Sequence, residues 1–374
     1  MVIRCIVYIV IFLLPLQFVY SANHEGAKEF RLMAHEKSLD HYPISYLRQI
    51  ADTIVSNQFP SGGWSKDQEW HIVPVSKKEI LDRKNHRKAM LRDGVGSTID
   101  NGATTSELLF LCKVYHLSPD LRYRTAAIRA IEYLLNSQYS CGGWPQFWPS
   151  RTKDCDRPFY SDHITFNDKA MINVLKELRS ISENKYPYSC LNIDLNTQKR
   201  CKIALQKGIQ CILDLQVRID GKPTVWCQQY DELTMKPASA RSFESPGLCG
   251  TIETVNILNF LMSIPQPSLE IVNSVTFAVD WLKCHSIKGW KVERYKNSEG
   301  KLDRRLVKSP NSELWARFYT LDTQKPFFSD YDRKIYYDFS KISYERRNGY
   351  SWLDDKPLVV IKRFQKWKNE VMAE

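Results

Sequence analysis

A recurring landmark constrains the fold of this chain of 374 residues more than any other feature. It consists of a glutamine that closes an apolar helical stretch, a short glycine-containing loop, and then a tryptophan. The landmark occurs at 58–64 and 138–144 and, in looser form, at 216–226. Its tryptophans, at positions 64, 144 and 226, are 80 and 82 residues apart (144 − 64 and 226 − 144). Self-similarity at a fixed period indicates stacked units that bury a continuous core together.

Apolar residues at helical spacing fill the stretches between the landmarks, whereas strand patterns are scarce. Thr104 and Glu107 have the spacing of a capping box at the start of one of these helices. The pattern predicts an all-α fold of antiparallel helix pairs joined by long loops, with little β structure. The predicted helices cover about 45–57, 104–115, 121–138, 168–181, 197–216, 251–263, 268–283 and 359–369.

The N-terminal end of the chain differs in character from the rest. Residues 1–21 combine Arg4, an apolar run and a small-residue cleavage site, which is typical of a secretory signal peptide. Residues 22–44 are polar and predict a loose N-terminal arm, and residues 45–374 predict a single catalytic domain. No later stretch is apolar enough for a membrane span. We therefore expect a secreted, extracellular protein without a membrane contact.

Cysteine content and charge agree with this compartment. Ten cysteines favour disulfides, and Cys141 with Cys155 and Cys190 with Cys201 each bracket a loop. The net charge of +11 favours a polyanionic partner. Because no nucleic-acid motif is present, we expect an acidic polysaccharide as the partner of a monomeric protein.

The alternation of helices and loops carries three charged residues to one end of the stack. Asp100, Asp168 and Arg241 all lie in loops that lead into helix starts after a landmark. Such converging polar groups are typical of a binding site. The alternative for each aspartate is a helix cap, and for Arg241 it is an ion pair with Glu244. Two carboxylates with nearby carbonyl groups could hold calcium, which prefers oxygen ligands.

Several further side chains are suited to a carbohydrate. Arg317, between aromatic residues, could clamp a carboxylate through two parallel hydrogen bonds. Trp148 and Tyr160 are candidates for stacking on sugars, whereas the landmark tryptophans are better explained as wedges that lock the repeat. His163 could act as a base, although a capping or supporting role is the stronger interpretation.

Six segments together resemble polysaccharide lyase family 10, the pectate lyases. They are STIDNGATTSELLFL (97–111), NSQYSCGGWPQFWP (136–149), HITFNDKAM (163–171), VWCQQYDELTMKPASARSFE (225–244), LWARFYTLDTQKPFFSD (314–330) and ERRNGYSWL (345–353). The resemblance implies an α/α toroid, an incomplete α/α barrel. It also implies calcium-dependent β-elimination of polygalacturonate, de-esterified pectin, to 4,5-unsaturated oligogalacturonides.

The same resemblance assigns roles by motif. Asp100 and Asp168 match acidic catalytic residues that serve calcium and substrate, Arg241 matches the base, and Arg317 matches a substrate-binding arginine. Tyr331 departs from the family, which commonly has arginine in this segment. Lys236 is the alternative base. The full set of predicted substrate ligands is Asn101, Lys66, Lys236, Arg317, His163, Trp148, Tyr160 and Lys325.

An arginine base requires an explanation, because a guanidinium normally stays protonated. Several nearby cations, including calcium, would disfavour a further positive charge and so lower the pKa of Arg241. Two other functions stay open at this point. One is a toroidal hydrolase that uses Asp100 and Asp168 as acid and base. The other is an inactive pectin-binding lectin, for which Tyr331 is the sequence argument.

Overall fold

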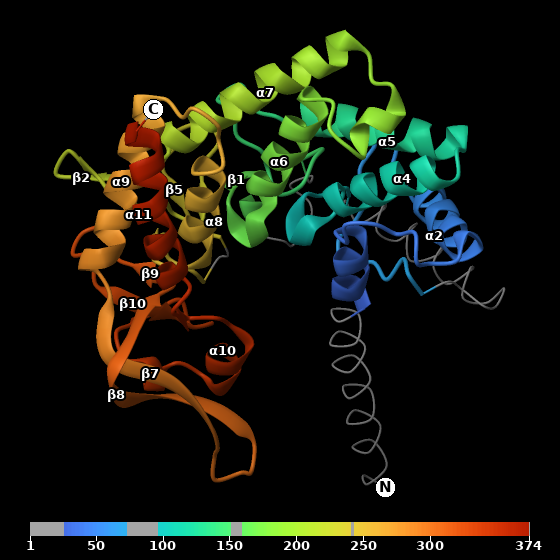
Figure 1. The fold of residues 1–374 in the computed structure, drawn as a ribbon. Helices are drawn as coiled ribbons and strands as arrows, with labels where there is room; N and C mark the ends of the chain where they lie inside the picture. The colour runs from blue at the N-terminus through green and yellow to red at the C-terminus, as the bar shows by residue number, and fades with distance from the viewer. Residues whose placement is uncertain (1–25, 73–95, 151–158, 241–242, 374) are drawn as a thin grey trace, which may run out of the picture. The chain divides into compact units, whose positions relative to one another are not determined.

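The computed structural model describes residues 26–72, 96–150, 159–240 and 243–373 (Figure 1). The chain forms two compact units that alternate along the sequence. The first unit comprises Met1–Ser137, Phe147–Cys155 and Glu177–Lys202, and the second comprises Gln138–Gln146, Asp156–Lys176 and Ile203–Glu374. The expected signal peptide at 1–21 lies outside the described residues. Within the described ranges, no helix has both the length and the apolar character that a membrane crossing requires.

Helices build the first unit. A helix at 26–34 precedes α2 (Ile44–Ser56), and α4 (Thr105–Leu117) packs against α5 (Leu121–Asn136). The segment predicted as a loose arm, 22–44, contains the helix at 26–34. Phe30 is buried with its ring 5.5 Å from that of Phe110 in α4, because the polar-looking segment still has an apolar helical face.

The second unit combines helices with short strands. Its helices are α8 (Ile252–Leu261), α9 (Leu269–Cys284), α10 (Tyr344–Gly349) and α11 (Pro357–Ala373). Helices α6 (Ala170–Ser182) and α7 (Leu195–Asp214) contribute residues to both units. The strands are β1 (Ile164–Thr165), β2 (Arg218–Ile219), β3 (Lys222–Pro223), β4 (Gln229–Tyr230), β5 (Pro237–Ala238), β6 (Leu248–Cys249), β7 (Ile287–Lys296), β8 (Leu302–Ala316), β9 (Phe318–Tyr319), β10 (Pro326–Ser329), β11 (Ile335–Tyr336) and β12 (Leu353–Asp354).

These strands form four small sheets, with the orders β1-β4-β5, β11-β10-β9-β6, β12-β8-β7 and β2-β3. The prediction of an all-α toroid is therefore wrong. The helices occur where the apolar period places them, but the long loops between them also form structure. Packed loops must satisfy their backbone N–H and C=O groups, and here they do so by pairing with one another.

The landmark has a common hydrogen-bond pattern in all three copies. Each glutamine amide donates to a carbonyl of its own loop and to a carbonyl of the neighbouring helix. For Gln58 the acceptors are Gly62 and Ala126, at 2.7 and 2.8 Å. The other copies are Gln138 with Gly142 and Ala204, and Gln216 with Thr224 and Ser274. The glutamine thus ties each loop to a neighbouring helix.

The landmark tryptophans are fully buried, which confirms that they act as wedges. Trp64 and Trp226 donate their indole N–H to carbonyls of Ile54 and Ile212 in the preceding helix, at 2.8 and 2.7 Å. Trp315 does the same to Leu282 at 2.7 Å, and it is also fully buried. It is a fourth copy that the sequence pattern missed, because the β7–β8 hairpin replaces its glycine loop.

The capping box predicted at Thr104 does not form. Thr104 has a left-handed backbone with φ +64°, and its hydroxyl donates to the carbonyl of Thr98 and accepts from the Trp64 N–H. Glu107 turns into the core, where it accepts a 2.7 Å hydrogen bond from the Trp70 indole. Burial raises the pKa of Glu107 to about 7.

The predicted disulfide between Cys190 and Cys201 is also wrong, since both are free thiols. Cys201 is fully buried on α7, whereas Cys190 contacts His116 Nδ1 at 3.3 Å. Cys141 is free as well, and its expected partner Cys155 lies outside the described residues.

Candidate active site

The small sheet β1-β4-β5 gathers several candidate residues of the second unit. Strand β4 is antiparallel to both β1 and β5, so β1 and β5 run in the same direction. The segments that follow them therefore leave the sheet at one edge. These segments are Phe166 to Asp168 after β1, and Ser239 and Ala240 after β5, which lead to Arg241. Arg241 itself lies outside the described residues.

Asn167 and Asp168 form a tight turn at this edge, within a 3-10 segment that precedes α6. Asp168 has a left-handed backbone with φ +48°, which is uncommon for a residue other than glycine and often marks a functional site. This is not the conformation of a helix cap. The Asn167 amide donates to Asp168 Oδ2 at 2.7 Å, and the Asp168 side chain is exposed. The turn therefore presents a carboxylate to solvent in a fixed position.

Arg317 approaches this turn from the start of β9. Its Nη2 donates to Asn167 Oδ1 at 3.3 Å and pairs with Glu253 Oε1, which lies in the first turn of α8. Gln228 donates to the same Asn167 oxygen at 2.5 Å. Arg317 and Gln228, which are distant in the sequence, thus converge on Asn167, the neighbour of Asp168, and Glu253 joins them through Arg317.

Several polar atoms in this group are buried without a protein partner within the part of the chain that the structure describes. They are Arg317 Nε, Glu253 Oε2 and Gln228 Oε1. A buried polar atom without a hydrogen bond costs free energy, and native structures contain few of them. Their accumulation around one turn is typical of a site that completes its hydrogen bonds with a ligand.

Arg317 keeps its charge in this environment. Burial by itself would lower the pKa of Arg317, but Glu253, Tyr350, Cys249 and Asp168 act in the opposite direction, and the pKa lies above its ordinary value. The guanidinium also lies over the Tyr350 ring at 4.3 Å. Its positive charge is thus permanent, which suits the recognition of an anion.

The other edge of the same sheet carries a different group. His163, Asp231 and Glu232 each offer a ligand atom, and these atoms lie within 4.8 Å of one another. One imidazole nitrogen and two carboxylates could hold a metal ion, and this set suits zinc better than calcium. Lys236 precedes β5 and is exposed at this edge. The sheet therefore separates His163 and Lys236 from Asp168.

The first unit holds the remaining predicted acid, Asp100. Its carboxylate is 2% exposed and accepts from Lys66 Nζ at 2.6 Å and from the Asn101 N–H at 3.0 Å. Asn101 has a left-handed backbone with φ +52° and donates to Asp67 at 3.2 Å. Three predicted site residues, Asp100, Asn101 and Lys66, are thus brought together.

The predicted stacking residues lie in different surroundings. Trp148 is half-buried and packs edge-on against Tyr133, with ring centroids 5.5 Å apart. Tyr160 is half-buried in the 3-10 segment Phe159–Asp162, and Lys325 is exposed just before β10. All three roles stay predictions.

Two observations bear on the segment around Arg241. Glu244 forms a buried ion pair with Arg346 at 2.9 Å, so the residue proposed to hold Arg241 is already engaged. Tyr331 contacts the ring of Phe243 at 4.9 Å and donates to Glu345 at 3.1 Å. Tyr331 therefore packs beside the chain that follows Arg241.

The sequence interpretation missed Glu253, Gln228 and Asn167 as functional candidates. Glu253 is the one charged residue of the helix 252–261, and such an isolated charge could have identified it. Gln228 and Asn167 have no comparable pattern, because only strand pairing places them together.

Comparison with known proteins identifies the family of this chain. The family model of pectic acid lyase matches residues 58–361. A family 10 polysaccharide lyase from Cellvibrio cellulosa is 34% identical, with a TM-score of 0.73 over 92% of this chain and 97% of that one. A point mutant of that enzyme in complex with trigalacturonic acid is 34% identical, with a TM-score of 0.72 over 91% of this chain and 98% of that one. No curated protein matches the chain.

The match covers most of the chain and includes the turn at Asn167, the segment through Gln228, and Glu253 and Arg317. The chain therefore belongs to the pectic acid lyase family and is a polysaccharide lyase.

Proposed function

We propose that this protein is a secreted pectate lyase that cleaves polygalacturonate by calcium-dependent β-elimination. The observation that carries the proposal is the convergence of Arg317, Asn167 and Asp168 in a chain of the pectic acid lyase family. The trigalacturonic acid bound to the Cellvibrio enzyme supports a galacturonate chain as the substrate. The apolar run after Arg4 supports secretion.

Calcium fits the chemistry of the turn at Asp168. A hard cation takes oxygen ligands, and Asp168 offers an exposed carboxylate whose direction is held by the left-handed turn. In the first unit, Asp100 could bind a cation only if its carboxylate exchanged Lys66 for the ion. When bound, calcium would neutralise the uronate carboxylate and make the neighbouring C5 proton easier to remove.

Arg317 is proposed to bind the same substrate carboxylate or the next one. Its Nε is buried and unpartnered within the described residues, so a carboxylate oxygen could accept from it without displacing Glu253. Glu253 and Asn167 hold the guanidinium plane and thereby fix the direction of its free donors. Positive charge placed in advance where negative charge develops is the effect expected to stabilise the enolate-like transition state.

Arg241 is proposed as the base that removes the C5 proton. The electrons of the C5–H bond form the C4–C5 double bond, the C4–O bond breaks, and the leaving oxygen takes up a proton. The strand order supports this choice over Lys236, because Ser239 and Ala240, which precede Arg241 in the sequence, leave β5 at the edge of Asp168, whereas Lys236 precedes β5 at the other edge. Calcium and Arg317 would lower the pKa of a neighbouring guanidinium, as this role requires.

One assay tests the proposal. The purified chain is mixed with polygalacturonate and calcium at alkaline pH, and ultraviolet absorbance and new reducing ends are followed together. Elimination predicts that both increase in parallel, because each cleavage leaves a conjugated unsaturated sugar. Reducing ends without absorbance would identify a hydrolase instead. Binding of the polymer with neither signal would identify a lectin.

A further inference from the structure

The β7–β8 hairpin separates its charges by face. Directly paired residues of an antiparallel ladder lie on the same face, and so do residues two positions apart. From the register, one face carries four cations and no carboxylate. We name it the basic face, and it consists of the pairs Trp290 with Lys308, Val292 with Leu306, Arg294 with Arg304, and Lys296 with Leu302.

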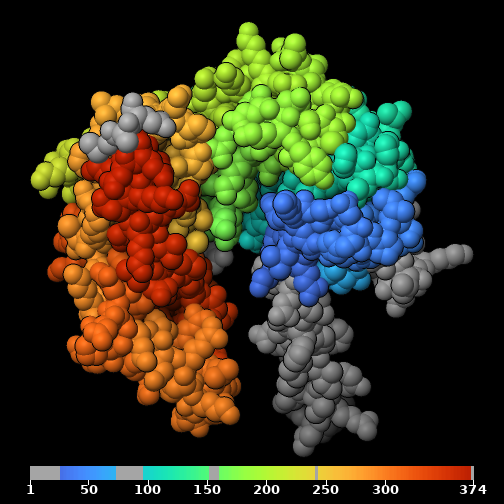
Figure 2. Space-filling view, in the orientation of Figure 1, coloured from blue at the N-terminus to red at the C-terminus, as the bar shows by residue number. Residues whose placement is uncertain are grey.

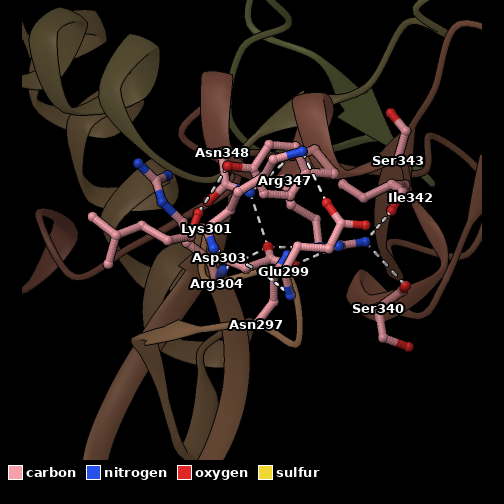
Figure 3. Close-up of polar contacts among 12 residues, drawn as sticks. Asn297, Glu299, Lys301, Asp303, Arg304, Ser340, Ile342, Ser343, Arg347 and Asn348 are labelled. Atoms are coloured by element: carbon pink, nitrogen blue, oxygen red, sulfur yellow. Dashed lines mark hydrogen bonds and ion pairs between the residues drawn. The ribbon is translucent and has the colours of Figure 1, made fainter.

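The opposite face is balanced. Its pairs are Lys291 with Val307, Glu293 with Arg305, and Tyr295 with Asp303. Glu293 pairs with Arg305 at 2.8 Å, and Asp303 accepts from Arg347 and Asn348 of α10 at 2.7 and 2.8 Å (Figure 3). Every carboxylate of this part of the ribbon is thus on one face and is already neutralised.

The basic face places two like charges directly opposite each other. Arg294 and Arg304 are cross-strand partners, an arrangement that destabilises a sheet. Arg304 donates to the Tyr350 carbonyl at 3.2 Å, and burial together with Arg294 lowers the pKa of Arg304. Arg294, Lys296 and Lys308 are exposed, and within the described chain none of them lies in an ion pair with a carboxylate.

The hairpin packs on the rest of this unit along β8, through Asp303, Arg304 and Leu306, and not through its exposed cations. A two-stranded ribbon is marginally stable in water. Among the described strands, β12 adds a third strand at the base of the ribbon, where it pairs with Trp315 and Ala316. Further along the ribbon, Leu306 packs against the aromatic cluster that contains Trp352. The two strands of the ribbon extend beyond β9 and β10 (Figure 1). In the space-filling view their atoms lie at the surface of this unit (orange, Figure 2).

The geometry suits an extended anionic chain. The cations from Lys308 to Lys296 occupy six residue steps along the ribbon, or about 20 Å. Lys308 Nζ is held 4.0 Å from the centre of the Trp290 ring, which keeps the ammonium on this face. Beyond Lys308, β8 continues to Ala316 and leads directly into Arg317, so the ribbon is covalently continuous with the proposed site.

We infer that the basic face binds a stretch of polygalacturonate outside the catalytic site, and this inference rests on the proposed function. A linear polymer with one carboxylate on each sugar complements a row of unpaired cations. The ribbon would then raise the affinity for long chains, whereas a trimer, which is held at the site alone, would not reach it.

The test compares two double variants with equal loss of charge. Arg294→Ala/Lys296→Ala removes two cations from the basic face. Lys288→Ala/Lys291→Ala removes two exposed cations from the same strand, one opposite Glu313 and one on the balanced face. Binding of long polygalacturonate is measured by calorimetry without calcium, over a range of salt concentrations, and trigalacturonate cleavage is measured with calcium.

The basic-face variant is expected to bind the polymer about tenfold more weakly and with a shallower salt dependence, while kcat/KM for the trimer stays within twofold of wild type. The control variant is expected to bind within twofold of wild type. An equal loss in both variants, or none in the first, overturns the inference. Lys308→Ala provides an independent second variant, and unchanged melting temperatures show that the ribbon is intact.

The two proposals fail in different ways. Wild-type cleavage of trimer and polymer, with unchanged binding by the basic-face variant, rejects only the ribbon. Polymer binding that weakens in this variant, without any unsaturated product from wild type, rejects the lyase proposal and leaves the ribbon as a binding surface. Wild-type protein that binds a DNA duplex or phosphatidylserine vesicles more tightly than polygalacturonate also overturns the assignment of the partner.

Discussion

Arg317 and Glu253 form an ion pair in which the two side chains are only 9% and 0% exposed. Each partner keeps one buried polar atom, Nε and Oε2 respectively, without a hydrogen bond to a described residue. A pair that served stability alone would be expected to use these atoms, since a buried ion pair offsets its desolvation only when its hydrogen bonds are complete. The relationship therefore favours a binding role.

Arg317→Lys separates this role from stability. Lysine keeps a positive charge beside Glu253 but lacks the planar fork of donors, so we expect activity on polygalacturonate to fall about 100-fold with a stability loss of about 1 kcal/mol. Arg317→Met leaves Glu253 unpaired and should cost about 3–5 kcal/mol. Adding Glu253→Gln should recover stability but not activity.

The measurements for these variants are urea denaturation and initial rates from ultraviolet absorbance. Arg346→Lys is the matched control, because Arg346 is also buried, paired with Glu244 and stacked on Tyr350 at 4.5 Å. It should lose stability with a smaller loss of activity. Wild-type turnover by Arg317→Lys would contradict the proposed clamp.

Removal of calcium should abolish activity and leave the helices intact. Asp168 lies in a turn at the end of a short strand, whereas the core consists of apolar helix faces, so the two are expected to respond separately. Chelator titration followed by absorbance and circular dichroism checks this. A collapse of the helical signal would show that the metal is structural.

Asp168→Asn is expected to raise the calcium concentration for half-maximal activity at least tenfold, because it removes a charged oxygen ligand. Glu232→Gln is the control, since Glu232 belongs to the group with His163 at the other edge of the sheet. A larger effect of Glu232→Gln would place the catalytic metal at that group.

Arg241→Ala should reduce turnover by several orders of magnitude and weaken polymer binding only modestly, because a base acts on the chemical step. Arg241→Lys should retain partial activity with an optimum at lower pH, since the ordinary pKa of lysine, about 10.4, is below that of arginine. Lys236→Ala is the control and should be nearly as active as wild type. The opposite ranking of the two alanine variants would assign the base to Lys236.

Glu107 predicts a pH dependence of stability. Its pKa is about 7 in the folded protein because of burial, against an ordinary value of 4.5. Between these values the native state binds a proton that the unfolded state has released. The contribution of Glu107 to the free energy of unfolding is therefore largest below pH 4.5 and falls as the pH rises to about 7. The loss amounts to about 3 kcal/mol.

Glu107→Gln should remove this dependence and stabilise the protein at pH 8, because the amide oxygen can still accept from Trp70. Urea denaturation at pH 5 and pH 8 measures both effects. Glu132→Gln, which affects a partly exposed partner of Arg200, is the control and should not change the slope. An unchanged slope in Glu107→Gln would mean that other groups cause the dependence.

Apolar periodicity, a local property, predicted the helices to within a few residues. The prediction at 45–57 corresponds to α2 (Ile44–Ser56) and that at 268–283 to α9 (Leu269–Cys284). The landmark tryptophans were also predictable as buried wedges, because a large residue that recurs at a fixed period indicates repeated packing. The motifs between residues 97 and 353 carried the resemblance to the family.

Tertiary structure decided the rest, because the deciding contacts join residues distant in the sequence. The sheet β1-β4-β5 depends on pairing between loops, which has no periodic pattern, and this pairing separates Lys236 from Asp168. The left-handed backbone of Asp168 shows that an aspartate before a helix is not always a cap. Glu253 and Arg317 are 64 residues apart (317 − 253), and only the packing of α8 against the start of β9 unites their charges.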